Sequence, residues 1–300
     1  MAFSESNNSR RRFLSAGALF GGSLLYAPSL LGQEPQERDT TEPVYRISKN
    51  DMPRGSAPTG SHPLDTALIM AQNSLNNIRT SIEDYTAVVV KREQINGEIG
   101  EHQYMGVKIR NRKVQDGKIV VPFSVYISFL GPSAVKGREA IYVENKNSGN
   151  VIAHEGGMRG RFLPTVNLDP NGMMAMRGQR YPITDMGIEN LVTKLIEKGE
   201  RDRKQGPCDV EFHKGAKIDK RECTVLTVRH PEKRACFDFC EAQIFIDNEL
   251  NIPVRYCAYE WPMVPGSDKK LLEEYTYVKV KTNVGLKDSD FDQNNPKYNF

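Results

Sequence analysis

Five cysteines are the residues of this chain that could do the most varied chemistry. All of them lie in the last third of the 300-residue sequence: Cys208, Cys223, Cys236, Cys240 and Cys257. A cysteine can act as a nucleophile, a redox centre or a metal ligand, and in an oxidising compartment it can form a disulfide. Their spacing discriminates between these uses.

A shared metal site would need Cys236 and Cys240 together with His213 or His230. The segment around the two cysteines has the alternation of a strand, in which each residue advances by about 3.3 Å. Four residues would therefore separate the two sulfurs by roughly 13 Å, which is too far for one zinc ion. We expect neither a metal site nor a cofactor.

One disulfide can be argued from geometry. Residues 237–246 and 252–259 are typical of two strands around a turn near Asn248, and that turn places Cys240 opposite Cys257. A register slip of one residue would turn the two sulfurs to opposite faces of the sheet. We therefore give the Cys240 to Cys257 bridge as a hypothesis that depends on the register of this hairpin.

No familiar catalytic motif accompanies the cysteines. The sequence has no nucleophile elbow, phosphate-binding loop, dinucleotide fingerprint or zinc-protease helix, and its five histidines are scattered. The C-terminal spacing of Asp288, Asp290 and Asp292 resembles the start of a calcium loop. However, Gln293 stands where that loop needs Gly, and Asn299 where it needs Glu. We interpret this segment as a capping turn and expect no enzyme.

The N-terminus has the pattern of a twin-arginine export signal. The motif is carried by Arg10, Arg11, Phe13 and Leu14, and it opens an uncharged stretch that runs to Gln33. We expect residues 1–32 to be cleaved after passage through the twin-arginine machinery. An uncleaved N-terminal anchor is the alternative, because residues 30–32 make a poor cleavage site. The protein is expected in the periplasm or cell envelope.

Composition divides the rest of the chain. Residues 33–61 are rich in Pro, Gly, Ser, Thr and charge and indicate a flexible linker, whereas residues 62–300 are long enough for one large domain. The 41 basic and 38 acidic residues nearly balance, and three of the arginines lie in the export signal. This charge distribution argues against nucleic-acid binding.

The apolar pattern of this domain predicts two helices and two runs of strands. One helix begins after His62 with Leu64, and the other begins at a cap on Thr184 or Asp185 and ends at Gly199. The predicted strands are 85–92, 104–110, 123–130, 140–144, 150–154, 209–213, 223–230, 237–246, 252–259 and 272–281. The fold class is α+β, with a single strongly curved antiparallel sheet (an incomplete β-barrel) whose concave face is covered by the helices.

The predicted strand 123–130 presents an apolar face that needs a cover. Apolar and polar residues alternate along it, so one face of the strand is apolar. The segment before the second predicted helix adds a group of methionines, which suit an adaptable apolar lining. An ordinary packed core is the simpler explanation of both features, but a curved sheet with only two helices leaves room for a pocket. The candidate ligand-binding residues are Phe123, Val125, Ile127, Phe129, Met173, Met174, Met176, Leu191 and Leu195.

Two segments carry a resemblance to known families. The end of the chain, with Tyr275-Thr276-Tyr277, residues 283–292 and Asn295-Pro296-Lys297-Tyr298, is similar to the close of an exported bacterial family, domain of unknown function 1571. Residues 121–132, followed by Lys136-Gly137-Arg138-Glu139, resemble the lipoprotein carriers of the LolA/LolB type. The carrier resemblance implies an incomplete barrel that holds acyl chains in the periplasm.

Three functions follow as hypotheses. The first is a non-enzymatic protein that binds a lipid or lipidated polypeptide in a concave apolar pocket. Such a protein is a candidate carrier, and contact with a membrane surface is a further alternative. The second is a structural or protein-interaction module of the cell envelope. The third is a redox or metal enzyme centred on the cysteines.

Overall fold

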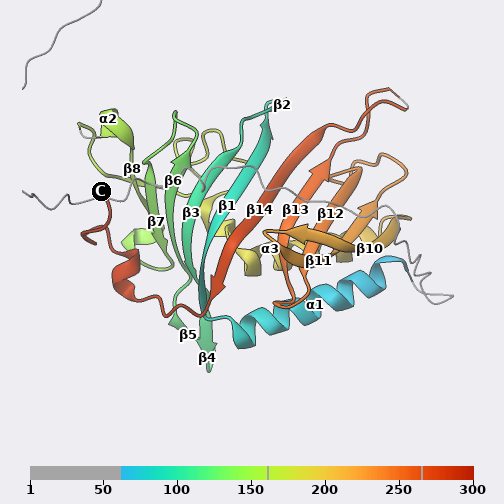
Figure 1. Cartoon of the computed structure of the whole chain (residues 1–300), viewed down its shortest axis with the longest axis horizontal. Coiled ribbons are helices and arrows are strands. Elements are labelled where there is room, and N and C mark those ends of the chain that lie inside the picture. Colours follow the sequence, from blue (N-terminus) through green and yellow to red (C-terminus); the bar gives the residue numbers. More distant parts are fainter. Residues whose placement is uncertain (1–61, 161, 265) are drawn as a thin grey trace, which may run out of the picture. The chain divides into compact units, whose positions relative to one another are not determined.

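The computed structural model describes residues 62–160, 162–264 and 266–300 (Figure 1). The predicted export signal with Arg10, Arg11, Phe13 and Leu14, the alternative anchor and the linker at residues 33–61 lie outside the described residues. No helix among the described residues is long and apolar enough to cross a membrane.

The elements follow the order helix, strands, helix, strands. The first part contains α1 (Leu64–Ser81), β1 (Asp84–Ile95), β2 (Glu98–Ile99), β3 (Gln103–Arg110), β4 (Lys113–Gln115), β5 (Lys118–Val121), β6 (Ser124–Gly131), β7 (Glu139–Val143), β8 (Val151–His154), α2 (Gly157–Gly160) and β9 (Val166–Leu168). The second part contains α3 (Ile188–Arg203), β10 (Asp209–Ile218), β11 (Arg221–Arg229), β12 (Glu241–Asp247), β13 (Ile252–Tyr259) and β14 (Leu271–Thr282). Short 3-10 turns lie at Asn147–Gly149, Ile183–Asp185 and Asp288–Phe291.

Among the described residues, twelve strands join one antiparallel sheet in the order β10, β11, β12, β13, β14, β1, β3, β6, β7, β8, β9, with β2 added to β1, while β4 and β5 form a separate two-stranded sheet. The two meanders therefore meet where β1 pairs with β14, at the centre of the sheet (Figure 1). Within the described residues, β9 and β10 are the edges and the sheet does not close. The predicted α+β class with an antiparallel sheet and two long helices is confirmed.

Helices α1 and α3 cover one face of the sheet. Leu75 and Ile78 of α1 and Val192 of α3 share a buried cluster with Val89 and Val107 of the strands. The predicted start of α1 after His62 is confirmed. The His62 carbonyl accepts a hydrogen bond from the Asp65 amide, and the His62 ring accepts one from the Leu64 amide. The covering face is thus built from the apolar stripes that the sequence predicts.

The predicted ends of α3 are both wrong. The helix is capped at Gly187, whose φ of 111° favours glycine, and the Tyr85 hydroxyl accepts the Ile188 amide at 2.8 Å. The helix also continues through Gly199 to Arg203. A Cβ atom at Gly199 would lie 2.9 Å from Leu68 Cδ2, so the glycine serves the close packing of α1 on α3 instead of ending the helix.

The hairpin of β10 and β11 reaches the centre of the sheet. Asp219, in its turn, accepts the Lys279 amide of β14 at 2.7 Å through the carboxylate. Cys223 and Val225 of this hairpin are fully buried and belong to the same cluster as Phe245. Strands β10 to β12 therefore bury side chains on both faces of the sheet. Leu226 and Val228 lie on the face under the helices, and Cys223 and Val225 lie on the opposite face.

The C-terminal segment, residues 283–300, is fixed to the sheet by ion pairs and stacking. Asp288 pairs with Arg110 at 2.7 Å, and Asp290 pairs with Lys108 at 2.6 Å. Tyr298 stacks on Tyr126 with ring centroids 3.9 Å apart. The aspartates that resemble a calcium loop thus serve as anchors and caps, which confirms the turn prediction.

Candidate binding site

A cavity of about 560 Å³ lies on the face of the sheet that α3 covers. The strands β1, β3, β6, β7, β8, β9, β13 and β14 contribute side chains to it. A segment that leads from β9 to α3 covers it, and α3 closes one side with Leu191 and Leu195. We call residues 169–187 the strap.

Five of the nine residues predicted from the sequence line this cavity: Ile127, Phe129, Met174, Leu191 and Leu195. Phe123 and Val125 do not, because they are buried in the core just before β6 and at its start; Val125 has no exposed surface. Met173 is 93% exposed and, like Met176, does not contribute to the cavity wall. The alternation of β6 thus predicts the correct face of the strand but not how far the cavity extends along it.

The wall on β1 and β14 is polar, and the sequence analysis missed it. Glu93 and Glu273 are cross-strand partners, and both are buried. The Tyr275 hydroxyl lies 2.5 Å from Glu93 Oε1 and 3.5 Å from Glu273 Oε2. Lys91 donates to Glu93 Oε2 at 2.9 Å. The available signal was a change from apolar to charged residues at the inward positions of β1, where Lys91 and Glu93 follow Val89.

The strap is attached to this polar wall. Arg180 Nε donates to Glu273 Oε2 at 2.9 Å, the Tyr181 hydroxyl donates to Glu273 Oε1 at 3.1 Å, and Lys91 donates to Gln179. Burial, and next the charge of Glu273, raise the pKa of Tyr181 and Tyr275 well above the usual range. Both hydroxyls therefore stay protonated and serve as donors to the carboxylates.

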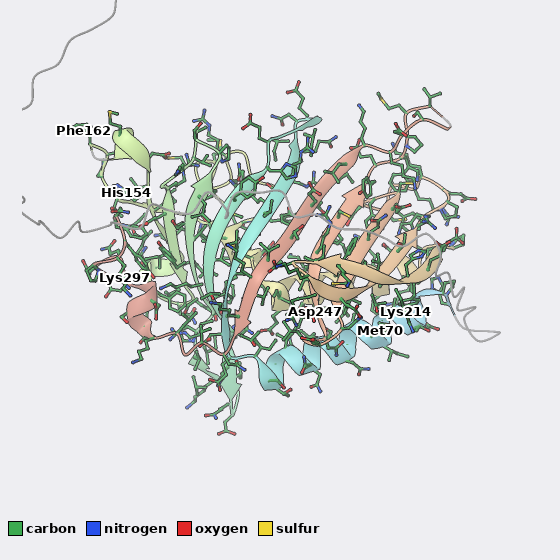
Figure 2. All side chains as sticks on the ribbon, in the orientation of Figure 1. Met70, His154, Phe162, Lys214, Asp247 and Lys297 are labelled. Atoms are coloured by element: carbon green, nitrogen blue, oxygen red, sulfur yellow. The ribbon has the colours of Figure 1, made fainter. Side chains whose placement is uncertain are left out.

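Exposed apolar residues occur in the cavity wall and on the loop that follows α2. Leu163 and Met174 line the cavity and are also exposed to solvent. Phe162, which closely follows α2, is 84% exposed and lies beside that helix at the edge of the molecule (Figure 2). We call Phe162, Leu163 and Met174 the rim. Since large exposed apolar groups often mark contact surfaces, the rim is a candidate contact region.

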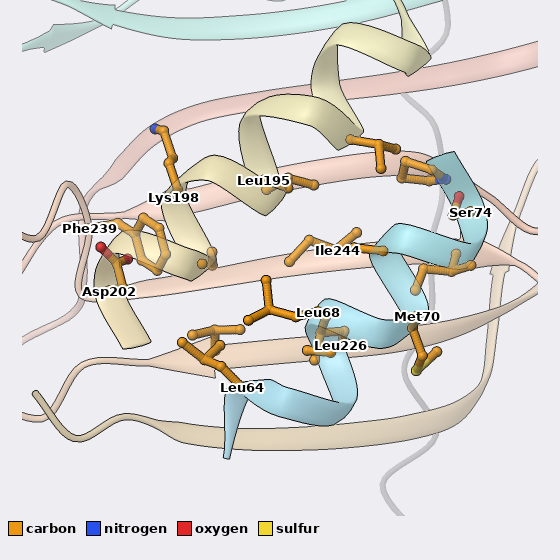
Figure 3. Close-up of a pocket in the computed structure, with 18 of the residues that line it drawn as sticks. Leu64, Leu68, Met70, Ser74, Leu195, Lys198, Asp202, Leu226, Phe239 and Ile244 are labelled. Carbon is orange, nitrogen blue, oxygen red and sulfur yellow. The ribbon is translucent and has the colours of Figure 1, made fainter. Parts of the chain in front are cut away.

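A second, smaller cavity of about 80 Å³ lies where α1 and α3 pack over β11 and β12. Figure 3 shows Leu68 of α1 and Leu195 of α3 in the space between the helices, with Leu226 and Ile244 on the strands. Its wall is almost entirely apolar.

The thiols do not form a reactive group. All five cysteines are free, and only Cys236 is partly exposed. Burial raises the pKa of Cys208 to about 12 and that of Cys223 to about 11. A thiol with such a pKa is almost wholly protonated at neutral pH and is a poor nucleophile. Among the described residues, no three His, Cys, Asp or Glu side chains are grouped so that they could hold a metal ion.

The register expected for the disulfide is wrong. Cys257 pairs with Gln243, and the Cys240 amide donates to the Tyr259 carbonyl, so Cys240 is not opposite Cys257. The turn follows Asp247, and a bulge at Phe245 and Ile246 shifts the pairing by a further residue. The strand register therefore does not bring Cys240 and Cys257 together as predicted.

The fold and the cavity define an open-sheet α+β protein with one face covered by helices. The chain belongs to the family described as protein of unknown function (DUF1571), whose model matches residues 82–300. The family predicted from the C-terminal motifs is thus confirmed. A comparison with curated proteins gave no match.

Several solved structures are similar at low identity. An outer membrane lipoprotein-sorting protein domain from Vibrio parahaemolyticus is 14% identical, with 76% of this chain and 96% of that chain covered and a TM-score of 0.36. A LolA superfamily protein from Nitrosomonas europaea is 10% identical, with 74% and 97% covered and a TM-score of 0.30. A chain of the Pseudomonas aeruginosa MucA/MucB complex is 11% identical, with 76% and 60% covered and a TM-score of 0.43.

Proposed function

We propose that this protein is an exported, non-enzymatic binding protein that holds a lipid, or the acyl part of a lipidated polypeptide, in the 560 Å³ cavity. The cavity is the observation that carries the proposal. Its size is in the range of small-molecule sites, and most of its wall is apolar. Burial of a hydrocarbon chain there would supply about 25 cal/mol per Å² removed from water, before the costs of association.

The two kinds of wall favour an amphiphile. Ile127, Phe129 and Leu191 offer an apolar surface, while Glu93 and Tyr275 offer carboxylate and hydroxyl groups at another side of the same cavity. A hydrocarbon chain would pack against the first surface, and the carboxylates of the second already accept hydrogen bonds from Lys91 and Arg180, so each buried carboxylate of the wall has a partner. In this proposal the open sheet curves around the ligand as an incomplete barrel.

The exposed rim supports a role in transfer. Leu163 and Met174 belong both to the cavity wall and to the exposed surface, so a ligand would leave water and enter the cavity over apolar side chains. The same rim, with Phe162, supports the alternative of an interaction module that contacts an envelope partner or membrane surface. The two functions differ in whether the cavity is occupied.

A cavity-filling variant tests the proposal. Ala153 lies on β8 and lines the cavity, so Ala153→Phe places a ring in the space that the ligand needs. The matched control is Val114→Phe, which adds the same ring at an exposed position on β4. Titration with a fluorescent long-chain fatty acid should show at least tenfold weaker binding for Ala153→Phe and unchanged binding for the control. Equal binding by both variants, or none by the original protein, would contradict the proposal.

A further inference from the structure

We propose that the 80 Å³ cavity is the far end of the ligand site and receives the terminal methylene and methyl groups of a long acyl chain. This inference rests on the function proposed above and specifies the ligand class: a single chain long enough to pass from the larger cavity under α3. Leu195 is the partition between the two spaces.

The two cavities meet at α3. Leu195 and Lys198 line both of them. Ile244, in the wall of the smaller cavity, is the direct cross-strand partner of Tyr256, in the wall of the larger one. Such partners have Cβ atoms about 5 Å apart on one face of the sheet. The spaces are therefore separated by the width of about one side chain.

The smaller cavity suits hydrocarbon and not a polar end. Its strands contribute Leu226, Val228 and Ile244. Its two charged residues already have partners, since Asp202 accepts from Arg201 at 2.9 Å and Lys198 lies 3.0 Å from Asp238. Dry apolar cavities accept apolar guests, and one of this volume is too small for a separate ligand of ordinary size. The end of a chain is the occupant that fits.

Leu195 can separate or join the two spaces without movement of the helix. It is only partly buried and lies one turn before Gly199, where Leu68 of α1 packs against α3. Because a leucine side chain has several staggered rotamers, a change of its χ angles would open the way while the helix contact holds.

The experiment measures chain-length preference in the full-length protein. Decanoate, tetradecanoate and octadecanoate would compete with a fluorescent fatty acid. Ala67→Leu fills the smaller cavity from α1, and Gln72→Leu, on an exposed position of the same helix, is the matched control. We expect Ala67→Leu to reduce the preference for octadecanoate over decanoate about tenfold, the effect of roughly two methylene groups that lose their burial. The control should keep the original preference.

A second variant guards against misfolding of Ala67→Leu. Leu195→Ala removes the partition and should raise the preference for octadecanoate about threefold, since more of the chain can be buried. If the original protein binds all three acids but neither variant changes the preference, the two-part site is wrong and the proposed function stands. If the original protein binds none of them, both are wrong.

Discussion

Glu93 and Glu273 lie opposite each other on β1 and β14, and the hydroxyl of Tyr275 lies between their carboxylates. Two buried carboxylates on neighbouring strands are stable only if cations and donors surround them. Lys91 and Arg180 supply the cations, and Arg180 comes from the strap. The charges of the sheet thereby hold the cover of the cavity in place.

Arg180→Gln should therefore loosen the strap. The change leaves the buried Glu273 without its cation and should lower the free energy of unfolding by about 3 kcal/mol. Adding Glu273→Gln should recover part of this loss, because no uncompensated charge remains. Hydrogen exchange should rise in residues 179–187 while the amides of β13 stay protected. Strictly additive effects of the two changes would show that the pair is not coupled.

Asp84 holds the beginning of the C-terminal segment. Asp84 is buried and accepts the amides of Val284, Gly285 and Leu286 at 2.7, 3.2 and 2.7 Å. Asp84→Ala removes the acceptor of all three and should cost about 3 kcal/mol of unfolding free energy, measured by denaturant titration. Asp84→Asn keeps an acceptor oxygen and should cost about half as much. A loss in Asp84→Ala no larger than that in Asp84→Asn would contradict this role.

Acid should release the same segment. The hydrogen bond from Arg110 lowers the pKa of Asp288. Burial by itself would raise the pKa of Asp290, but the hydrogen bonds from Lys108 and from the Lys287 amide outweigh it, so this pKa is lowered as well. A carboxylate with a lowered pKa in the folded state stabilises it fully above the ordinary value of 3.8 and loses this effect as the pH falls below it. Nuclear magnetic resonance of Tyr298 should follow this release. In the double variant Asp288→Asn with Asp290→Asn, the change of the Tyr298 signal below the ordinary pKa of Asp should disappear.

Thiol labelling tests the cysteine assignments. One thiol, that of Cys236, should react with a thiol reagent in the native protein, and the other four should react only after unfolding, because they are buried. The labelled sites would be identified by peptide mass spectrometry. Failure of Cys240 and Cys257 to react even in the unfolded, unreduced protein would show that they form a bridge.

Local patterns account for most of what could be predicted. Strand β13 occupies the predicted residues 252–259, and the stripe of α1 and the alternation of β6 lie on the face that the pattern indicates. These signals are periodic within one element, so they can be read without knowing the partner element. The turn that contains Asp288 and Asp290 could be predicted from its local spacing. Their partners Arg110 and Lys108 could not, because they lie on β3, which is distant in the sequence.

The failures have a non-local cause. Strand β12 begins at Glu241 and not at Phe237, because Phe237 and Phe239 are buried around His230 in a loop and imitate the alternation of a strand. The polar wall was missed because Glu93 and Glu273 become neighbours only when β14 pairs with β1. Such pairings depend on the register of the whole sheet, which no single segment encodes.

Native mass spectrometry of the protein purified from its own cell envelope, followed by organic extraction and lipid analysis, shows whether the 560 Å³ cavity holds a lipid. We expect a stoichiometric adduct that contains an acyl chain and is lost in Ala153→Phe but kept in Val114→Phe. An unliganded mass for the original protein, with no lipid in the extract, would contradict the claim and favour the interaction module.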